Sequence, residues 1–316
     1  MPTVLLTQRF PDPVMEELRK RFTVVGPLSE RHALIQAIPL ADALAVTLAE
    51  QVDAELLSHA SRLKIVAVYA VGYNNVDLAA AGARGIVVTN TPDVLTETTA
   101  DLTWGLILAV ARRIPEGERL LRQGRWEGWA PTHHLGTDVY GKTLGIVGMG
   151  RIGSAVARRA AGFNMVVLYH SRRRLSPSEE KALKAVPMAL PELLRRSDFV
   201  SLHAPLTPET RHLIGKAELE LMRNHAFLIN TARGPLVDEP ALVEALSNRG
   251  IAGAGLDVYE NEPRIHPELL KLENVVLAPH IGSATYETRV KMGMVVVENI
   301  AAALSGREPS TPVRVG

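Results

Sequence analysis

Three polar residues of this chain stand at positions where a side chain could do chemistry. Arg233 directly follows the apolar run 227–232, and His280 directly follows the apolar run 275–279. Glu262 lies between them in the chain, in a turn. Ligands of open α/β sheets bind beyond the carboxyl ends of the strands, so residues that follow strand-like runs are candidates for a site.

An arginine, a carboxylate and a histidine form a complete set for reducing a 2-oxo acid, provided that they lie beside a nicotinamide. We expect Arg233 to hold the substrate carboxylate and to polarise the ketone through its bidentate, permanently charged fork. His280, as imidazolium, is expected to give its proton to the carbonyl oxygen while hydride arrives from the cofactor. Glu262 is expected to accept a hydrogen bond from the other ring nitrogen, which orients His280 and favours its charged form.

Each of these residues also has a structural interpretation. Any one of the ten histidines is more often a satisfied structural residue than a catalytic one, and His203, after the run 199–202, has nearly as good a position as His280. Arg233 could cap a sheet edge, and Glu262 could be a surface charge. The conjunction of the three residues favours the catalytic interpretation.

A glycine-rich motif predicts a dinucleotide cofactor. It lies between the strand-like run 143–147 and a helix expected over 152–162, and its cofactor-binding residues are Gly148, Gly150, Arg151, Ile152 and Gly153. The first glycine allows a tight turn, the second lets backbone N–H groups approach the pyrophosphate, and the third lets the helix pack closely on the strand. The motif alone also fits a plain glycine-rich turn, but its place between a strand and a helix favours a phosphate at the helix N-terminus.

The next strand-like run, 165–170, ends about twenty residues beyond the glycines, where an NAD-binding chain carries an acidic residue for the ribose 2′-hydroxyl. This chain instead has Ser171, Arg172, Arg173 and Arg174 there. Guanidinium forks suit phosphate oxygens, so the loop favours NADP(H), with NAD(H) still possible. The alternative is a solvated basic surface loop.

Composition excludes several classes of function. The 316 residues are 47% hydrophobic and 22% charged, as in ordinary soluble globular proteins, and the formal net charge of +1 argues against nucleic acid or an anionic membrane as a partner. The start of the chain has no signal-peptide pattern, and the apolar stretch 102–111 is too short to span a bilayer. With no cysteine there is no disulfide or thiolate site, and we expect a cytoplasmic protein.

No metal is expected. His133 and His134 are adjacent and lack the helical spacing and companion motif of a metal-dependent hydrolase.

Apolar runs alternate with helical patterns almost from end to end, which predicts an α/β protein with two doubly wound parallel-sheet domains. Strands are expected at 4–7, 43–48, 64–70 and 87–90, and then at 143–147, 165–170, 185–188, 199–204, 226–232, 253–259 and 275–279. A long helix is expected from Thr96 to about Gln123, and the helix 286–304 is expected to return to the first domain. The expected organisation is a Rossmann cofactor domain, 99–284, inserted in a flavodoxin-like substrate domain, 1–98 plus 285–316.

The sequence resembles the D-isomer-specific 2-hydroxyacid dehydrogenase family over essentially its full length. The matching motifs are 147–153, 230–234, 255–263 and 278–283. The resemblance implies that Arg233, Glu262 and His280 are the catalytic trio. It also implies cofactor contacts from Thr99, Pro205, Thr231, Ala232 and Asp257.

Within the family, the segments 69–77, 98–101, 138–143 and 171–173 are most similar to the glyoxylate/hydroxypyruvate reductases. This resemblance implies NADPH-preferring reduction of glyoxylate and hydroxypyruvate to glycolate and D-glycerate. It implies that the backbone N–H groups of the Val71-Gly72 turn bind the substrate carboxylate. It further implies a homodimer held by the segment 99–129, in which Trp129 either limits substrate size in the partner's site or anchors the interface.

Three other functions compete with this one. A 3-phosphoglycerate or phosphite dehydrogenase running oxidatively with NAD is disfavoured by the missing acidic residue after His170 and by the lack of a pattern for a regulatory domain. A non-catalytic NAD(H)-sensing corepressor would share the fold and the trio, but nothing resembles an extra interaction tail. A metal-dependent hydrolase lacks its motif. The rank order of small 2-oxo acids is left open by the sequence.

Overall fold

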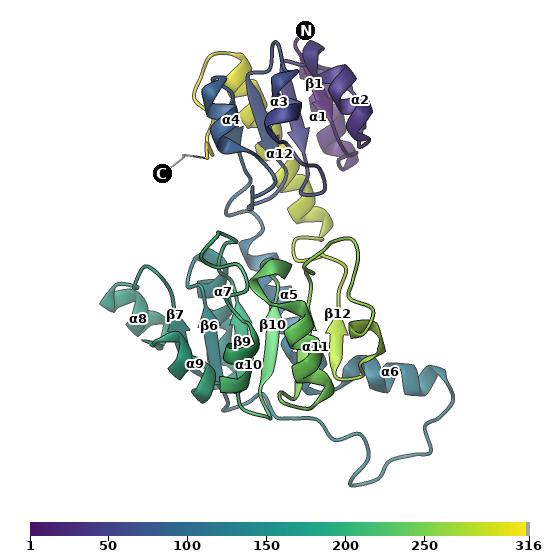
Figure 1. The fold of residues 1–316 in the computed structure, drawn as a ribbon, viewed down its shortest axis with the longest axis vertical. Helices are drawn as coiled ribbons and strands as arrows, with labels where there is room; N and C mark the ends of the chain where they lie inside the picture. The colour runs from purple at the N-terminus through teal and green to yellow at the C-terminus, as the bar shows by residue number, and fades with distance from the viewer. Residues whose placement is uncertain (314–316) are drawn as a thin grey trace. The chain divides into compact units, whose positions relative to one another are not determined.

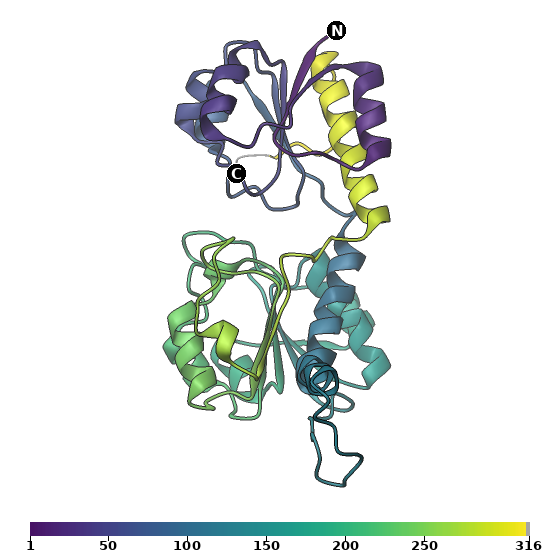
Figure 2. The same ribbon diagram turned by 90° about the vertical axis from the view of Figure 1, so that its right-hand side faces the viewer.

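The computed structural model describes residues 1–313. The chain forms two compact units, of which unit 1 holds Met1–Leu95 and the chain from Ser283 onward, and unit 2 holds Thr96–Gly282. Each unit is a parallel β-sheet with helices packed against it (Figures 1 and 2). The α/β class with two doubly wound sheets is therefore confirmed.

The sheet of unit 1 has the strand order β2-β1-β3-β4-β5, which is the flavodoxin-like order. Its strands are β1 (Thr3–Leu6), β2 (Thr23–Val25), β3 (Ala43–Val46), β4 (Ile65–Val68) and β5 (Val87–Thr89). The sequence reading missed β2, a three-residue edge strand whose side chains stay largely exposed. Strands β3 and β4 are buried along their whole length, as is typical of parallel strands covered on both faces.

The helices of unit 1 come from both ends of the chain. They are α1 (Asp12–Arg21), α2 (Arg31–Ala37), α3 (Ala54–Ser58), α4 (Leu78–Ala83) and α12 (Tyr286–Leu304), with a 3₁₀ turn at Ile38–Leu40. Helix α12 packs against α1 and β4. Gly293 of α12 makes this approach possible, because a Cβ there would overlap the side chain of Val14. The last helix is thus part of the core of unit 1.

After α12 the chain returns to the sheet. Thr89 of β5 forms an antiparallel bridge with Pro312, and the N–H of Val313 donates to the carbonyl of Val88 at 2.8 Å. The segment 310–313 therefore extends the sheet of unit 1 at its β5 edge.

The sheet of unit 2 has the order β12-β11-β10-β9-β6-β7-β8, a Rossmann arrangement with one further strand. Its strands are β6 (Thr143–Val147), β7 (Val166–His170), β8 (Ala185–Pro187), β9 (Phe199–Leu202), β10 (Phe227–Asn230), β11 (Gly253–Leu256) and β12 (Val275–Leu277). Every expected strand begins within one residue of its expected start. Most end earlier than the apolar runs do, and the leftover residues form the loops at the carboxyl edge of the sheet.

The helices of unit 2 cover the sheet in Figure 1. They are α5 (Thr96–Ala111), α6 (Ile114–Arg122), α7 (Arg151–Ala160), α8 (Pro177–Leu183), α9 (Leu190–Arg196), α10 (Lys216–Leu221) and α11 (Glu239–Ser247), with 3₁₀ turns at Ala161–Phe163, Gly234–Leu236 and Leu269–Lys271.

The expected single helix from Thr96 to Gln123 is wrong. The segment instead forms two helices, α5 and α6, which are separated at Arg113. This residue has a φ of 54°, in the left-handed region. Pro115 explains the break, because its ring would clash with the carbonyl of Ala111 in a continuous helix and it has no N–H to donate. Beyond α6 the loop 123–142 extends away from the body of unit 2 (Figures 1 and 2).

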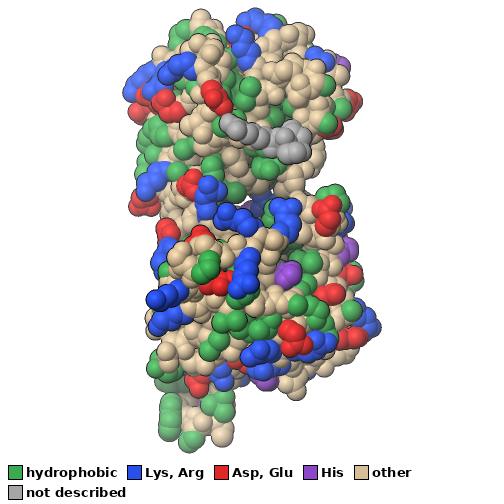
Figure 3. Space-filling view, turned by 90° about the vertical axis from the view of Figure 1, so that its left-hand side faces the viewer, with side chains coloured by type: hydrophobic (Ala, Val, Ile, Leu, Met, Phe, Trp, Pro, Cys, Tyr) green, Lys and Arg blue, Asp and Glu red, His purple; other side chains and the backbone are tan. Residues whose placement is uncertain are grey.

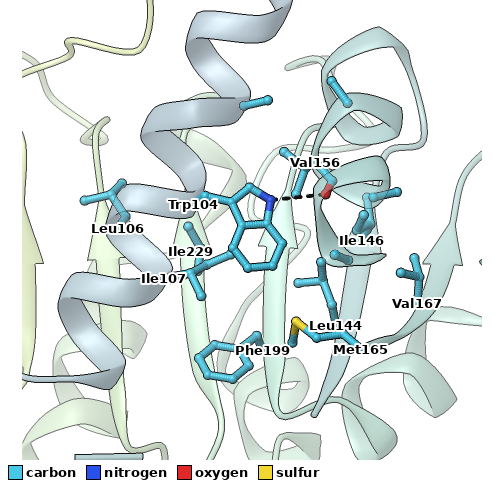
Figure 4. Packing of buried hydrophobic residues seen from close by; sticks show 14 of the residues in the cluster. Trp104, Leu106, Ile107, Leu144, Ile146, Val156, Met165, Val167, Phe199 and Ile229 are labelled. Carbon is cyan, nitrogen blue, oxygen red and sulfur yellow. Dashed lines mark hydrogen bonds between the residues drawn. The ribbon is translucent and has the colours of Figure 1, made fainter. Parts of the chain in front are cut away.

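The core of unit 2 fixes the helix that follows the glycine motif. Trp104 of α5 lies among buried side chains of the sheet, and its indole N–H donates to the carbonyl of Val156 on α7 at 3.1 Å (Figure 4). The same ring stacks on Phe163, with 4.5 Å between the ring centroids. At the surface, Arg159 of α7 pairs with Asp101 of α5. Helix α7 is therefore held rigidly against α5 and the sheet.

Candidate functional site

The glycine motif adopts the geometry that a bound pyrophosphate needs. Gly148 has a φ of 97°, and a Cβ there would lie 2.5 Å from the N atom of Ala204. A Cβ on Gly153 would overlap the carbonyl oxygen of Gly148, so this position also accepts only glycine. Gly150, the N-cap of α7, faces open space. An anion can therefore approach the backbone N–H groups at the start of α7, where the helix dipole attracts it.

The three arginines of the basic loop after β7 have different surroundings. Arg174 pairs with Glu180 at 2.9 Å, and Glu180 also accepts a hydrogen bond from the hydroxyl of Tyr169 at 2.7 Å. Arg172 and Arg173 are exposed. Arg174 is therefore used to fix the loop.

His280 and Glu262 form the hydrogen bond that the sequence reading expected. Nδ1 of His280 lies 2.7 Å from Oε2 of Glu262, whose other oxygen accepts from the N–H of Tyr259 at 2.9 Å. Partial burial acts to raise the pKa of the Glu262 carboxyl, but the hydrogen bond and positive charge of His280 outweigh it and the pKa is lowered. The pair leaves the Nε2 edge of His280 for a ligand.

The backbone at His280 is held by a buried carboxylate. His280 has a φ of 54°, which is uncommon for a residue with a side chain. Asp257, only 1% exposed, accepts hydrogen bonds from the N–H groups of Ile281 at 2.7 Å and Gly282 at 2.8 Å. Burial raises the pKa of Asp257. Thr99 is also close, because a Cβ on Gly282 would lie 3.4 Å from its methyl group.

Arg233 lies at the end of β10 on a tightly braced turn. The side-chain N–H₂ of Asn230 donates to the carbonyl of Arg233 at 2.9 Å, and its oxygen accepts from the N–H of Ala232 at 3.0 Å. One guanidinium nitrogen of Arg233 donates to the carbonyl of Ala232 at 2.7 Å. Burial lowers the pKa of Arg233, and the negative charge of Glu262 opposes this effect. The guanidinium therefore lies within electrostatic reach of Glu262.

Backbone contact joins the turn of Arg233 to the loop of Glu262. A Cβ on Gly234 would overlap the carbonyl group of Tyr259. Strands β10, β11 and β12 are neighbours in the sheet, and Arg233, Glu262 and His280 follow these three strands. The structure thus brings the three residues together at one edge of the sheet.

A further buried carboxyl group, missed by the sequence reading, supports the same loop. Glu239, at the start of α11, is 5% exposed and accepts a hydrogen bond from the N–H of Glu260 at 3.0 Å. Burial raises the pKa of Glu239. Glu260 in turn binds Nε2 of His212 at 2.6 Å. An acidic residue in the first turn of a helix is common at surfaces, so the sequence carried no signal of its burial.

His203, the competing histidine, has a different environment. Its Nε2 lies 2.9 Å from the hydroxyl of Ser201, and burial lowers the pKa of His203 to about 3. At neutral pH its imidazole is therefore uncharged and lacks the imidazolium proton that a general acid gives. The two histidines also differ in partner, because His203 contacts a neutral hydroxyl group whereas His280 contacts a carboxylate.

The remaining cofactor candidates lie on neighbouring elements of unit 2. Thr99 and Thr231 are both buried, and the hydroxyl of Thr103 links them through the carbonyl of Thr99 at 2.8 Å and the hydroxyl of Thr231 at 2.9 Å. Pro205 is exposed in the loop after β9. Ser171 and Ile152 are partly buried, and Arg151 is exposed at the start of α7.

In unit 1 the Val71-Gly72 turn follows β4. The carbonyl of Val71 accepts a hydrogen bond from the side chain of Asn90 at 2.8 Å. Within residues 1–313, the N–H groups of Val71 and Gly72 have no acceptor on the protein. Buried Asn75 fixes the other end of the turn by donating to the carbonyls of Thr47 at 2.9 Å and Glu50 at 2.7 Å. The sequence reading identified the turn but neither asparagine.

Trp129 lies on the projecting loop 123–142 and is 84% exposed.

In the described part of the chain, no group of three or more His, Asp or Glu side chains is arranged to hold a metal ion. None of the helices within residues 1–313 is both long and apolar enough to cross a membrane.

Comparisons with known proteins extend these observations. A family model described as the NAD binding domain of D-isomer specific 2-hydroxyacid dehydrogenases matches residues 104–282. The glyoxylate reductase of Thermococcus onnurineus is 51% identical over 320 residues, which cover 99% of this chain and 96% of that protein.

Solved structures are similar over the whole chain. A protein from Thermus thermophilus is 48% identical with a TM-score of 0.93, covering 99% of this chain and 100% of the other. An NADPH-dependent glyoxylate/hydroxypyruvate reductase from Sinorhizobium meliloti, in complex with NADP and malonate, is 39% identical with a TM-score of 0.90, covering 99% of this chain and 96% of the other.

The environment of His203 predicts a pH dependence of stability. The unfolded chain binds a proton at this histidine below a pH of about 6.5, whereas the folded protein binds it only near pH 3. The stability that depends on neutral His203 is therefore fully present above about pH 6.5 and declines as the pH falls toward 3. We expect the urea midpoint to fall less between pH 7 and pH 5 in His203→Gln than in the wild type.

His59→Gln, a change at an exposed histidine of unit 1, is the matched control and should follow the wild type. In the wild type, the His203 ring resonances in NMR spectra should not titrate between pH 5 and pH 8. A titration midpoint near 6.5 would contradict the buried, neutral assignment.

Proposed function

Because the chain belongs to the D-isomer-specific 2-hydroxyacid dehydrogenase family, we propose that it reduces glyoxylate and hydroxypyruvate to glycolate and D-glycerate, with NADPH preferred over NADH. The observation that carries the proposal is the 2.7 Å contact between His280 and Glu262 beside the partly buried Arg233. The glyoxylate reductases among the relatives, about half identical to this chain, support the choice of substrate.

Each residue of the trio has a separate task in the proposed reaction. A reduced nicotinamide, when bound, would supply the hydride for the carbonyl carbon. Arg233 binds the substrate carboxylate and polarises the carbonyl group with its charged fork. His280 uses Nδ1 to bind Glu262, so Nε2 is the atom that gives a proton to the carbonyl oxygen. Glu262 keeps the ring oriented and stabilises its charged form.

The proposed cofactor site is built around the start of α7. Its N–H groups hold the pyrophosphate, while Ser171, Arg172 and Arg173 hold the 2′-phosphate. The further proposed contacts come from Thr99, Pro205, Thr231, Ala232 and Asp257. NAD(H) fits the same pyrophosphate site but leaves the two arginines without a phosphate. The bound NADP of the Sinorhizobium meliloti reductase supports this choice of cofactor.

The proposed substrate contacts include the Val71-Gly72 turn. Its amide N–H groups have no acceptor within residues 1–313 and are therefore available to a carboxylate. Malonate in the Sinorhizobium meliloti structure is likewise a small carboxylate.

We also propose that the enzyme is a homodimer. The helix α6 exposes two apolar side chains, Ile114 and Leu121, and the loop 123–142 exposes Trp126, Trp129 and Leu135. In Figure 3 this loop is the lowermost segment, and hydrophobic side chains gather there. Clustered apolar surface of this kind is typical of a protein–protein contact. In the dimer, Trp129 anchors the interface or limits substrate size in the partner's site.

The first test is the substrate profile and its dependence on His280. Wild-type protein should oxidise NADPH with glyoxylate and with hydroxypyruvate. Replacing His280 with Ala should lower kcat by about 10²- to 10⁴-fold, the usual contribution of a general acid, while the Kd for NADPH stays within about twofold of wild type. His225→Ala, at the opposite end of β10, is the matched control. Unchanged turnover in His280→Ala would rule out its role as proton donor.

The second test concerns the 2′-phosphate. Arg172→Ala and Arg173→Ala should each raise the KM for NADPH about ten- to hundredfold, as expected for a lost charged hydrogen bond of about 1.5–3 kcal/mol, and change the KM for NADH little. Arg195→Ala is the matched control, because Arg195 is an exposed arginine on α9 that is paired with Glu192. It should leave the ratio of the two KM values unchanged. Equal losses for both cofactors in the Arg172 and Arg173 variants would remove the assignment.

The third test is the oligomeric state. Light scattering should give a mass of twice the 34.3 kDa chain. Leu121→Glu, at a side chain on α6 that is 58% exposed, should produce monomers because it places a charge in the proposed interface. Leu270→Glu, at a position 62% exposed elsewhere in unit 2, should remain dimeric. A monomeric wild type would refute the proposed dimer.

A further inference from the structure

A single side-chain amide joins the loops that follow two neighbouring strands of unit 1. Asn90, just beyond β5, donates to the carbonyl of Val71, just beyond β4, at 2.8 Å. One residue away, the N–H of Thr91 donates to the carbonyl of Ala70 at 2.8 Å. The backbone hydrogen bond of Thr91 continues the pairing of the two strands. At the next position the side chain of Asn90, and not a backbone N–H, donates the hydrogen bond.

This contact fixes the direction of a peptide group. The cis peptide bonds of residues 1–313 are Gly26–Pro27 and Glu262–Pro263, so the bond between Val71 and Gly72 is trans. In a planar trans peptide, C=O and N–H point in opposite directions. Since the carbonyl of Val71 points to Asn90, the N–H of Gly72 points away from Asn90. That N–H has no protein acceptor within the described residues.

The same contact increases the donor strength of this N–H. A hydrogen bond accepted by a carbonyl group polarises its peptide, and bonds in a chain strengthen one another. A hydrogen bond from an N–H to a carboxylate is charge-assisted and is roughly twice as strong as a neutral one. A donor to the carbonyl of Val71 therefore favours an anion at the N–H of Gly72.

The backbone of Asn90 is itself held by the segment that follows α12. The N–H of Asn90 donates to the carbonyl of Thr311 at 3.3 Å, and the hydroxyl of Thr311 donates to the carbonyl of Asn90 at 2.6 Å. Buried Asn299 of α12 donates to that hydroxyl at 2.7 Å and accepts from the N–H of Ser310 at 3.0 Å. Both main-chain polar groups of Asn90 are thus occupied, which leaves its side chain at a fixed place over Val71.

We propose that Asn90 is a positioning residue for the substrate carboxylate. It acts through the Val71–Gly72 peptide, whose N–H it orients and polarises toward the anion, and Thr311 keeps it in place. The inference rests on the proposed function, in which this turn receives the carboxylate of a small 2-oxo acid. A purely structural role, in which Asn90 only ties two loops together, makes a different prediction.

The experiment measures the binding of oxalate to the full-length enzyme saturated with NADPH. Oxalate carries the carboxylate of the substrate but is not reduced, so its Kd from calorimetry reports binding without turnover. Asn90→Ala removes the donor, and Asn90→Asp keeps the shape but places an oxygen against the carbonyl of Val71. Both variants should raise the Kd for oxalate at least about tenfold and raise the KM for glyoxylate by a similar factor. The Kd for NADPH should stay within about twofold.

Asn274→Ala is the matched control. Asn274 also donates its side-chain amide to backbone carbonyls, those of Leu246 at 3.3 Å and Ala252 at 3.2 Å, but in unit 2. It should lower Tm without changing the Kd for oxalate. Thr311→Val removes the hydroxyl that holds the backbone of Asn90. It should raise the Kd for oxalate about two- to fivefold, the effect of one neutral hydrogen bond.

Two outcomes would overturn the inference. One is wild-type affinity for oxalate in both Asn90 variants. The other is an equal loss of oxalate and NADPH binding together with a fall in Tm, which is the signature of a merely structural tie. Failure of the proposed function looks different, because the wild type would then bind oxalate without reducing glyoxylate. A wild type that binds no oxalate would overturn the assignment of the turn and with it the role of Asn90.

Discussion

The candidate site depends on a backbone contact that leaves no room for a side chain. Gly234 meets the carbonyl group of Tyr259 so closely that any other residue would force the two segments apart. Arg233 stands immediately before this contact and Glu262 three residues beyond it. Because main chain touches main chain, the two charged groups are set by rigid backbone rather than by flexible side chains. The trio can then be held with little conformational freedom left to lose on binding.

Carboxyl groups brace the same region. Asp257 holds the backbone beyond His280 through two N–H groups, and Glu239 holds the backbone of Glu260. Both are almost fully buried, and burial raises the pKa of each. Glu262 differs, since its contact with His280 lowers its pKa. The surroundings of one site thus shift the pKa values of its carboxyl groups in opposite directions, and the carboxyl beside the imidazole is the one whose pKa is lowered.

Much of this architecture could be predicted from the sequence. Runs of apolar residues located the strand starts closely, because parallel strands buried on both faces need continuous apolar residues. They located the strand ends poorly. The run 253–259 continues three residues past the end of β11, since Val258 and Tyr259 are buried in the loop and not in the sheet. Apolar character reports burial, and near a site the loops are buried as well.

What the sequence could not predict involves single polar contacts over long separations. Asn90 meets Val71 and Thr311, and Glu239 meets Glu260, with nothing in local spacing to mark either pair. The break at Arg113 could have been anticipated from Pro115, but the apolar pattern continued through it. The candidate site residues after the strands could be predicted from the sequence, because only a few residue types can bind a carboxylate or transfer a proton. The asparagine and acidic residues that support them cannot be distinguished in the sequence from surface residues of the same type, and only the structure shows their contacts.

The inclusion of α12 in the first unit has a consequence for biosynthesis. Val14 of α1 packs on Gly293 of α12, so the core of unit 1 cannot close until α12 has left the ribosome. The residues of unit 2 are all made before that point. Domains usually complete themselves in order from the amino terminus. Here the first sheet, whose five strands are made before unit 2, must wait for α12 while the second unit is finished, and the apolar surface that α12 covers stays open to a chaperone during this interval.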